Sequence, residues 1–192
     1  FQRLSYVGEL GWELYIPIHQ SKEIYETIVE AGISFNLMHA GAHAMDIMRM
    51  EKKYLHWGHD ISPEENPFEA GLGFAVDLKK DVNFIGKDAL IKIQNKPLKK
   101  QLIMLTLKNS SPGQPLLMHD EPIYCDGKIV GETTSGNYSF KYNKNMSLGY
   151  INISDDKVKL KKRFFQIEVS KIKYDAKFES LPLHDPYNIY MK

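Results

Sequence analysis

The feature that most limits the fold of this chain is a change in the pattern of apolar and polar residues at 96–100, Lys-Pro-Leu-Lys-Lys. Beyond this point the apolar residues come in short runs that alternate with polar ones, and turn signals separate the runs about every eight to twelve residues. Such spacing is typical of a small barrel or sandwich. The Asp126-Gly127 pair is a strong signal for a type I′ hairpin turn. We expect strands at 102–107, 123–125, 128–132, 147–151, 163–169 and 172–178.

The first 96 residues carry a mixture of helix and strand signals. Apolar residues alternate on both sides of a glycine turn at 8–11, which is a hairpin pattern, and other apolar residues recur at helical spacing. The expected fold class is therefore α+β, with an all-β domain after residue 96. We expect a hairpin over 4–18, helices over 21–32, about 40–52 and 87–94, a loop over 54–70, and a strand over 72–78.

Composition and charge exclude several classes of protein. Of 192 residues, 43% are hydrophobic and 26% are charged, which argues against a disordered chain. The 25 Lys and Arg residues nearly balance the 24 Asp and Glu residues, so no electrostatic argument favours nucleic acid or an anionic membrane surface. No apolar run approaches the roughly 20 residues of a membrane span. Cys125 is the single cysteine, which excludes intrachain disulfides and cysteine-based zinc sites.

The turn at residues 6–13 is the first candidate for binding chemistry. Its two glycines, Gly8 and Gly11, would let the backbone approach a flat ligand closely. Glu13 follows between apolar neighbours, where its carboxylate could accept two parallel N–H bonds from an amidine-like ring edge such as that of a pterin. The alternative is an ordinary hairpin with a solvated glutamate.

Arg49 is the second candidate, because it lies among apolar residues of an expected helix. It could bury its stem and offer its guanidinium to a carboxylate or a ring carbonyl. Asp46 precedes it by three positions, so an ion pair within the helix is the alternative.

Histidine pairs suggest a metal site only weakly. His39 and His43 are four positions apart, and His56 and His59 are three apart. The first pair lacks the glutamate expected between them, and no thiolate is near, so we favour no metal site. We expect His59 and Asp60 to tether the loop instead.

Two further stretches have simple structural interpretations. Residues 133–136, Thr-Thr-Ser-Gly, lack the surroundings of a nucleophilic serine, and we expect a turn leaving a barrel strand. Lys99 and Lys100 fit a solvated linker, and a contact with an anionic tail is the alternative.

Several motifs in one order resemble the glycine-cleavage T-protein family, the tetrahydrofolate-dependent aminomethyltransferases. Single motifs of this kind are modest evidence, whereas five in order across about 150 residues are strong. The motifs are Tyr-Val-Gly-Glu-Leu-Gly-Trp-Glu-Leu at 6–14, Asp-Ile-Met-Arg-Met-Glu-Lys at 46–52, the stretch from Trp-Gly-His-Asp to Gly-Leu-Gly-Phe at 57–74, Phe-Ile-Gly-Lys-Asp-Ala-Leu at 84–90, and Gly-Glu-Thr-Thr-Ser-Gly-Asn-Tyr-Ser with Leu-Gly-Tyr-Ile at 131–139 and 148–151.

The amino-acid sequences at 56–60, 69–76 and 182–186 are most similar to the folate-binding half of dimethylglycine and sarcosine dehydrogenases. The resemblance implies a three-lobed protein with a central folate channel. Residues 1–96 would supply much of the α/β second lobe, residues 97–180 the β-barrel third lobe, and residues 181–192 a C-terminal tail.

The same resemblance implies a role for five residues. Glu13 matches the carboxylate that binds the pterin edge, and Tyr6 matches an aromatic residue lining the same cavity. Arg49 matches the arginine that reaches the folate, and Phe74 falls where some relatives place a tryptophan that packs on it. Tyr190 matches a C-terminal ligand contact. The implied cofactor is tetrahydrofolate.

One departure from the family concerns catalysis. The acid/base aspartate of the family lies before the first motif, so we assign no catalytic residue in this chain. The chain opens with Phe1, Gln2 and Arg3 directly before apparent strand sequence, and we expect it to be cut from a longer protein.

The resemblance implies one-carbon transfer from a small amine-derived donor to folate, giving 5,10-methylene-tetrahydrofolate. The implied location is the cytoplasm, or the mitochondrial matrix in a eukaryote. The missing first lobe, or a flavin domain that generates the donor, would lie elsewhere. The alternative is a non-catalytic folate-binding or assembly module that acts with a partner chain.

Overall fold

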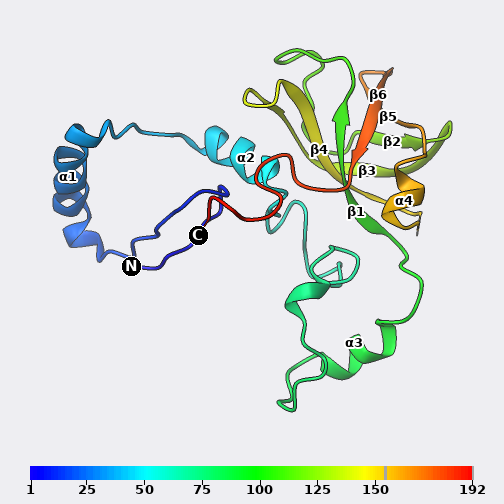
Figure 1. Ribbon diagram of the computed structural model, residues 1–192, viewed down its shortest axis with the longest axis horizontal. Coiled ribbons are helices and arrows are strands. Elements are labelled where there is room, and N and C mark those ends of the chain that lie inside the picture. Colours follow the sequence, from blue (N-terminus) through cyan, green and yellow to red (C-terminus); the bar gives the residue numbers. More distant parts are fainter. Residues whose placement is uncertain (154, 192) are drawn as a thin grey trace.

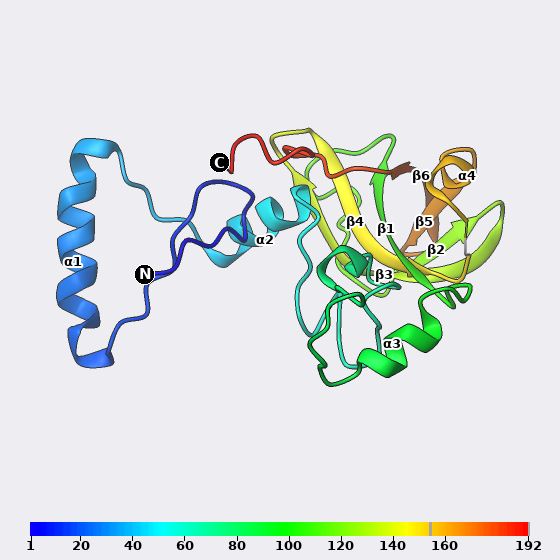
Figure 2. The same cartoon turned by 60° about the horizontal axis from the view of Figure 1, so that its bottom comes forward.

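A computed structural model describes residues 1–153 and 155–191. A closed six-stranded antiparallel barrel forms the C-terminal part, and helices and loops form the N-terminal part (Figures 1 and 2). The predicted α+β fold class is therefore confirmed. Around the barrel the strand order is β1-β4-β3-β2-β5-β6. The strands are β1 (Gln101–Leu107), β2 (Pro122–Cys125), β3 (Lys128–Ser139), β4 (Lys144–Ile151), β5 (Phe165–Val169) and β6 (Ile172–Glu179).

Strand β1 is buried on both faces and links the barrel to the rest of the chain. Ile103 and Leu105 belong to the cluster that fills the barrel. Leu102 and Met104 belong to a second cluster, outside the barrel, that includes Met50 of helix α2 (Ala42–Glu51). Burial of each such side chain stabilises the fold by about 1.5–3 kcal/mol, so this second cluster fixes α2 against the barrel wall.

The predicted hairpin turn between β2 and β3 is confirmed. Asp126 and Gly127 have φ values of 50° and 83°, and a type I′ turn requires positive φ at both central residues. Strand β3 extends seven residues beyond the predicted end at 132 and includes residues 133–136. The prediction of a turn at 133–136 is therefore wrong.

The predicted helices are confirmed, and helix α4 was not predicted. No helix within residues 1–153 and 155–191 combines the length and the apolar character that crossing a bilayer would require. The helical segments are η1 (Ile18–Gln20), α1 (Ser21–Gly32), η2 (Ile33–Phe35), α2 (Ala42–Glu51), η3 (Gly73–Ala75), α3 (Lys87–Ile93) and α4 (Lys157–Leu160).

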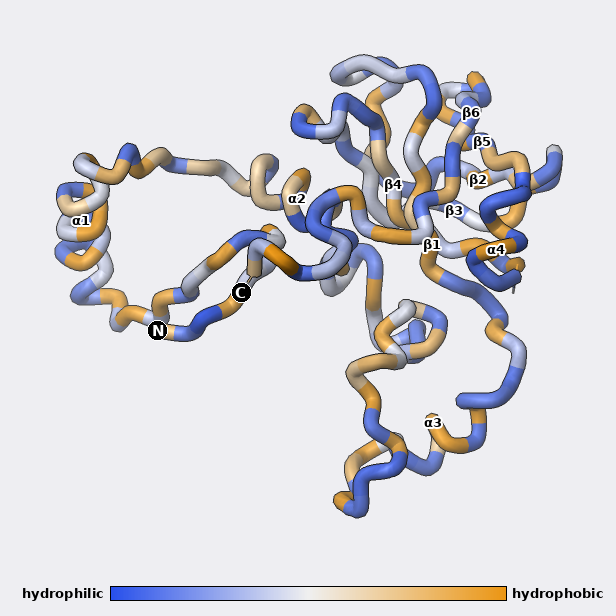
Figure 3. The backbone as a smooth tube through the Cα atoms, in the orientation of Figure 1, coloured by the Kyte–Doolittle hydropathy of each residue, from blue (hydrophilic) through white to orange (hydrophobic). Residues whose placement is uncertain are grey.

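The strands predicted at 4–18 and 72–78 are wrong. The first region is loop held by a single bridge between Gln2 and Glu13, and the second contains the 3₁₀ turn η3. Neither α1 nor its flanking 3₁₀ turns bury a residue, and Figure 3 shows hydrophobic positions along α1 where it stands apart from the barrel. A hairpin without a further strand or a packed helix is marginal in water, which explains the absence of strands.

Candidate functional site

The C-terminal end of α2 carries charged side chains into the interior. Arg49, Glu51 and Lys52 are 2%, 4% and 3% exposed. Met50 between them packs on the barrel, and this contact turns the neighbouring charges toward the strands and the tail. Buried charges need partners, and the partners of these three define the architecture of the site.

Arg49 is engaged at all three guanidinium nitrogens. Nε donates to Asp46 Oδ1 (2.8 Å), and Nη1 donates to Asp60 Oδ2 (2.5 Å) and to the carbonyl of Tyr54 (3.2 Å). Nη2 donates to Ser135 Oγ (2.8 Å) on β3 and also lies 2.8 Å from Asp46 Oδ1. The helical ion pair with Asp46 is present, and Arg49 additionally joins α2 to a loop and to the barrel.

Asp60 is the centre of this network and is fully buried. Its Oδ2 accepts from Arg49 and from the backbone N–H of His56 (2.9 Å). Its Oδ1 accepts from the hydroxyls of Thr134 (2.5 Å) and Ser135 (2.8 Å). Four donors neutralise and orient one carboxylate, so the loop at 54–62 is fixed on β3. Asp60 does tether this loop, as predicted, although His59 does not contribute to the four bonds.

The other two buried charges fix the barrel end and the C-terminal tail. Glu51 accepts from the hydroxyl of Ser139 (2.6 Å) at the end of β3. Lys52 Nζ donates to the carbonyl (2.6 Å) and to Oδ2 (3.1 Å) of Asp185. The tail is therefore anchored directly beside α2.

Tyr6 lines two cavities beside this network. The aromatic cavity, of about 650 Å³, is walled by Tyr6, Tyr54 and Phe74, together with aliphatic side chains and Lys53. The histidine cavity, of about 520 Å³, is lined by Tyr6, Arg49, four histidines and residues of β3. Tyr6 donates its hydroxyl to the carbonyl of Leu55 (3.1 Å), and burial raises its pKa, although Arg49 opposes the shift. Volumes of about 300–1,000 Å³ are usual for ligand sites.

Lys53 is an unusual lysine at the edge of the aromatic cavity. It adopts the left-handed conformation (φ 60°) directly after Lys52, the C-cap of α2, where glycine is common. Burial lowers the pKa of its ammonium to about 8, and Lys157 adds to this effect. The charged form is therefore costly in the folded protein.

We expect Lys53→Met to raise the free energy of unfolding at pH 7 by about 1–3 kcal/mol, because the charged group no longer has to be buried. Between pH 8 and 10.5 the unfolded chain binds more protons at this position than the folded chain. The stability of the unmodified protein therefore rises over this range and the advantage of the variant fades. Urea unfolding at pH 7 and pH 10.5 measures this, and Lys22→Met, whose side chain is 86% exposed, is the control.

The structure brings together some of the sequence-predicted residues and separates others. Tyr6 and Phe74 line the aromatic cavity, and Tyr6 and Arg49 line the histidine cavity. Glu13 lines neither cavity; it is exposed and accepts a bond from the hydroxyl of Tyr15 (2.9 Å). Tyr190 stacks on His184, with ring centroids 6.0 Å apart and an interplanar angle of 4°.

Sequence reasoning missed Thr134 and Ser135 as partners of the buried network. The four consecutive residues of polar or small type at 133–136 were a visible signal, but only the strand register directs two hydroxyls at Asp60.

The histidines that suggested a metal site have other neighbours. His39 Nε2 lies 2.7 Å from the hydroxyl of Tyr25, and the rings of His56 and His59 lie 4.5 Å apart. Within the described ranges, no cluster of three or more His, Cys, Asp or Glu side chains is arranged to hold a metal ion.

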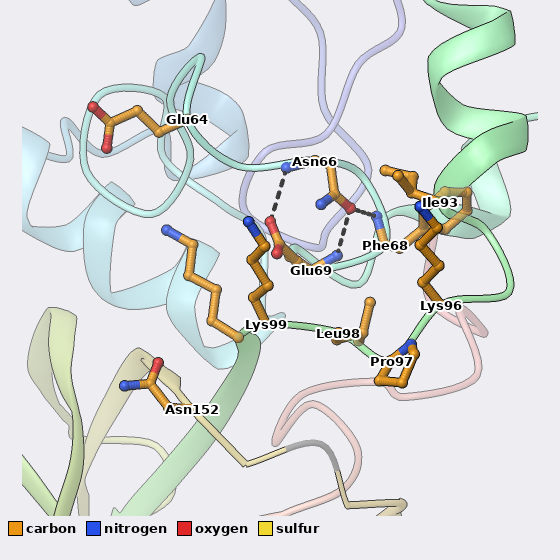
Figure 4. Close-up of a pocket in the computed structure, with 11 residues that line it drawn as sticks. Glu64, Asn66, Phe68, Glu69, Ile93, Lys96, Pro97, Leu98, Lys99 and Asn152 are labelled. Atoms are coloured by element: carbon orange, nitrogen blue, oxygen red, sulfur yellow. Dashed lines mark hydrogen bonds between the residues drawn. The ribbon is translucent and has the colours of Figure 1, made fainter.

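A further hollow, of about 400 Å³, lies between the loop at 64–69, the end of α3 and the linker before β1 (Figure 4). Asn66 and Glu69 close its wall through mutual hydrogen bonds (Figure 4). Lys100 pairs with Glu65 (2.5 Å) and lies over the Tyr150 ring, so it is not simply solvated. None of the five predicted ligand contacts lines this hollow.

The chain is similar in sequence to several enzymes of larger size. It is 41% identical over 149 residues to mitochondrial dimethylglycine dehydrogenase of Homo sapiens, which covers 78% of this chain and 17% of that enzyme. It is 38% identical over 157 residues to an aminomethyltransferase of Symbiobacterium thermophilum, covering 81% and 40%. It is 34% identical over 188 residues to 4-methylaminobutanoate oxidase (formaldehyde-forming) of Paenarthrobacter nicotinovorans, covering 96% and 22%. The chain thus spans less than half the length of these relatives.

The fold is similar to that of the glycine cleavage system aminomethyltransferase T of Bartonella henselae. The TM-score is 0.81 over 96% of this chain and 49% of that structure, at 23% identity. The GCVT N-terminal domain model matches residues 1–80, and the glycine cleavage T-protein C-terminal barrel domain model matches residues 100–185. Fold, barrel and both family models agree, and the chain belongs to the glycine cleavage T-protein family.

Proposed function

We propose that the aromatic cavity and the turn at 8–13 bind the pterin end of tetrahydrofolate. The observation that supports this most is that Tyr6 and Phe74, which are 68 positions apart in sequence, line one cavity of about 650 Å³. When bound, tetrahydrofolate would accept a one-carbon unit from an amine-derived donor, giving 5,10-methylene-tetrahydrofolate.

The residues at the cavity fit a flat heterocycle. Tyr6, Tyr54 and Phe74 supply aromatic faces, and offset or edge contacts between rings add about 0.5–1.5 kcal/mol each beyond burial. Phe74 is 88% exposed, so its ring is available for a ligand without rearrangement of the core. Glu13 would accept hydrogen bonds from the N–H groups of the pterin edge, which would replace the hydroxyl of Tyr15 as donors.

Arg49 would have a structural role and would not contact the ligand. Its nitrogens are engaged by Asp46, Asp60 and Ser135, so in this arrangement its guanidinium has little capacity left for a ligand. We propose that it holds α2, the loop at 54–62 and β3 in the positions that form the wall behind Tyr6.

The relatives' names support amine chemistry for the polypeptide as a whole. Dimethylglycine, sarcosine and 4-methylaminobutanoate are all N-methyl amines, and one relative is named as forming formaldehyde. A donor of this class would deliver the one-carbon unit. A first lobe or a flavin domain, on the same or another polypeptide, would complete the reaction, and this chain would contribute folate binding.

Titration of the full chain with tetrahydrofolate, followed by calorimetry, tests the proposal. We expect one saturable site, and we expect p-aminobenzoylglutamate, which lacks the pterin, to bind far more weakly. Equal affinities for the two compounds would place the recognition elsewhere on folate and contradict a pterin site in the aromatic cavity.

We expect Phe74→Ala to weaken tetrahydrofolate binding by about 1 kcal/mol, or roughly five-fold in Kd, through loss of one ring contact. The same titration measures the effect. Phe35→Ala is the matched control, because Phe35 is 83% exposed and lies in η2, away from both cavities. Equal affinities of the two variants would remove Phe74 from the site.

A second candidate is a non-catalytic folate-binding or assembly module, and the exposed apolar side chains of the N-terminal part favour it. Helix α1 buries no residue, although Tyr25 and Ile28 lie on it. A one-carbon transfer assay on the natural gene product, together with its mass, separates the candidates. Folate binding without transfer would support the module, and transfer by the natural product would support the enzyme.

A further inference from the structure

His184 lies at the point where the C-terminal tail meets the turn at 8–13. The residue is 5% exposed, and its Nε2 lies 2.7 Å from Oε1 of Glu9. Both views show the N-terminal turn and the C-terminal tail side by side next to α2 (Figures 1 and 2). Neither the family resemblance nor the proposed function gives His184 a role.

The neighbours of His184 determine which ring nitrogen carries the proton. Nδ1 lies 3.0 Å from the hydroxyl of Tyr142 and 3.1 Å from Nζ of Lys141, and a lysine ammonium can only donate. Nδ1 is therefore the acceptor and Nε2 carries the N–H; Nε2 lies close to the carboxylate of Glu9, but no hydrogen bond of normal geometry joins them.

Contacts other than Glu9 fix the position of His184, so its ring does not move with Glu9. The backbone N–H of His184 donates to the carbonyl of Glu51 (2.9 Å), and Asp185 is anchored by Lys52. Asp185 also accepts from the backbone N–H of Tyr190, whose ring stacks on His184. His184 is thus fixed to α2 and can serve as an anchor for a less constrained segment.

The turn at 8–13 is such a segment. Within it only Gly8 is buried, where the turn lies against the stem of Lys52 and a Cβ would approach Cδ of that lysine to 2.9 Å. Beyond Gly8 the segment is held by the bridge between Gln2 and Glu13 and by Glu9, whose side chain is 42% exposed and also lies 3.9 Å from Nζ of Lys141. The contact to His184 is the short polar contact that joins this turn to the tail.

We infer that His184 is a positioning residue that anchors the turn through Glu9 and so sets the place of Glu13. The inference rests on the proposed function only where it connects the turn to folate affinity. His184 touches no ligand in this scheme. Its contribution is to keep the turn in one position relative to α2, so that Glu13 need not be ordered when a ligand binds.

Fluorescence anisotropy of Trp12 tests the anchoring independently of folate. Trp12 lies in the turn, and Trp57→Phe removes the other tryptophan of the chain. In that background His184→Ala should lower the anisotropy, and His184→Gln should restore much of it. Adding Glu9→Ala to His184→Ala should lower the anisotropy no further. His119→Ala is the control, because this histidine is 53% exposed and pairs with Asp120.

The same variants titrated with tetrahydrofolate test the connection to binding. Without the anchor, the side chain of Glu13 has to be ordered when the ligand binds, so we expect His184→Ala and Glu9→Ala each to raise Kd by about two- to ten-fold. An unchanged Trp12 signal in both variants would overturn the inference, whatever the affinity. A mobile Trp12 with unchanged affinity would support the anchor and contradict the role of Glu13 in the proposed function. If His184→Ala does not fold, Glu9→Ala still decides, because Glu9 is not part of the core.

Discussion

Replacing Asp60 by alanine is expected to lower the free energy of unfolding by about 3–5 kcal/mol, because the change removes the fully buried carboxylate of the two that pair with the buried guanidinium of Arg49. Three further donors, from His56, Thr134 and Ser135, lose their acceptor at the same time. Urea unfolding followed by circular dichroism measures the effect as a lower midpoint at unchanged slope.

Two comparisons make this prediction specific. Glu26→Ala removes a carboxylate on helix α1 whose side chain is 62% exposed, and it should change stability by less than about 0.5 kcal/mol. The double variant Arg49→Met with Asp60→Leu removes both charges, and it should recover part of the loss. A loss for Asp60→Ala no greater than for Glu26→Ala would show that the network does not hold α2 on the barrel.

The barrel could be predicted because its signals are local. The end of one strand was mispredicted where a glycine is required by a contact with residues distant in sequence. The alternating runs and the Asp126-Gly127 turn depend on neighbours in sequence. Strand β3, in contrast, continues through Gly136, where a Cβ would lie 2.6 Å from the carbonyl carbon of Leu117. Glycine is needed there because the chain segment at Leu117 approaches closely, and the sequence at 133–136 alone suggested a turn.

The strands expected at 4–18 and 72–78 show the opposite error. Leu14 and Phe74 lie in sequences with good strand patterns, yet they are 37% and 88% exposed. A strand forms only where a partner and a buried face are available, and neither is a property of the strand's own sequence. Local propensity was therefore overridden by the lack of a second layer in this part of the fold.

The candidate site was predictable only in its local components. The pair of Asp46 and Arg49 follows from their spacing of three on a helix. The bond from Arg49 to Ser135 joins residues 86 positions apart, and the contact of Glu9 with His184 joins the two ends of the chain. No periodicity encodes such contacts, because they depend on how α2, the tail and the barrel pack together.

Glu13→Ala is expected to weaken tetrahydrofolate binding by about 2–4 kcal/mol, the range for losing one member of a charge-assisted contact that becomes desolvated in the complex. Glu13 is exposed in the free chain, so its removal should leave the unfolding midpoint unchanged. Glu23→Ala, on the exposed helix α1, is the control for the loss of one negative charge.

Tyr15 provides an independent check on the same carboxylate. Its hydroxyl donates to Oε2 of Glu13, and this bond raises the pKa of Tyr15. If the pterin edge donates to both carboxylate oxygens of Glu13, it must displace the Tyr15 hydroxyl. Tyr15→Phe should therefore bind tetrahydrofolate as tightly as the unmodified chain or more tightly. A change of less than about 0.5 kcal/mol for Glu13→Ala, or weaker binding by Tyr15→Phe, would assign pterin recognition to other groups around Tyr6.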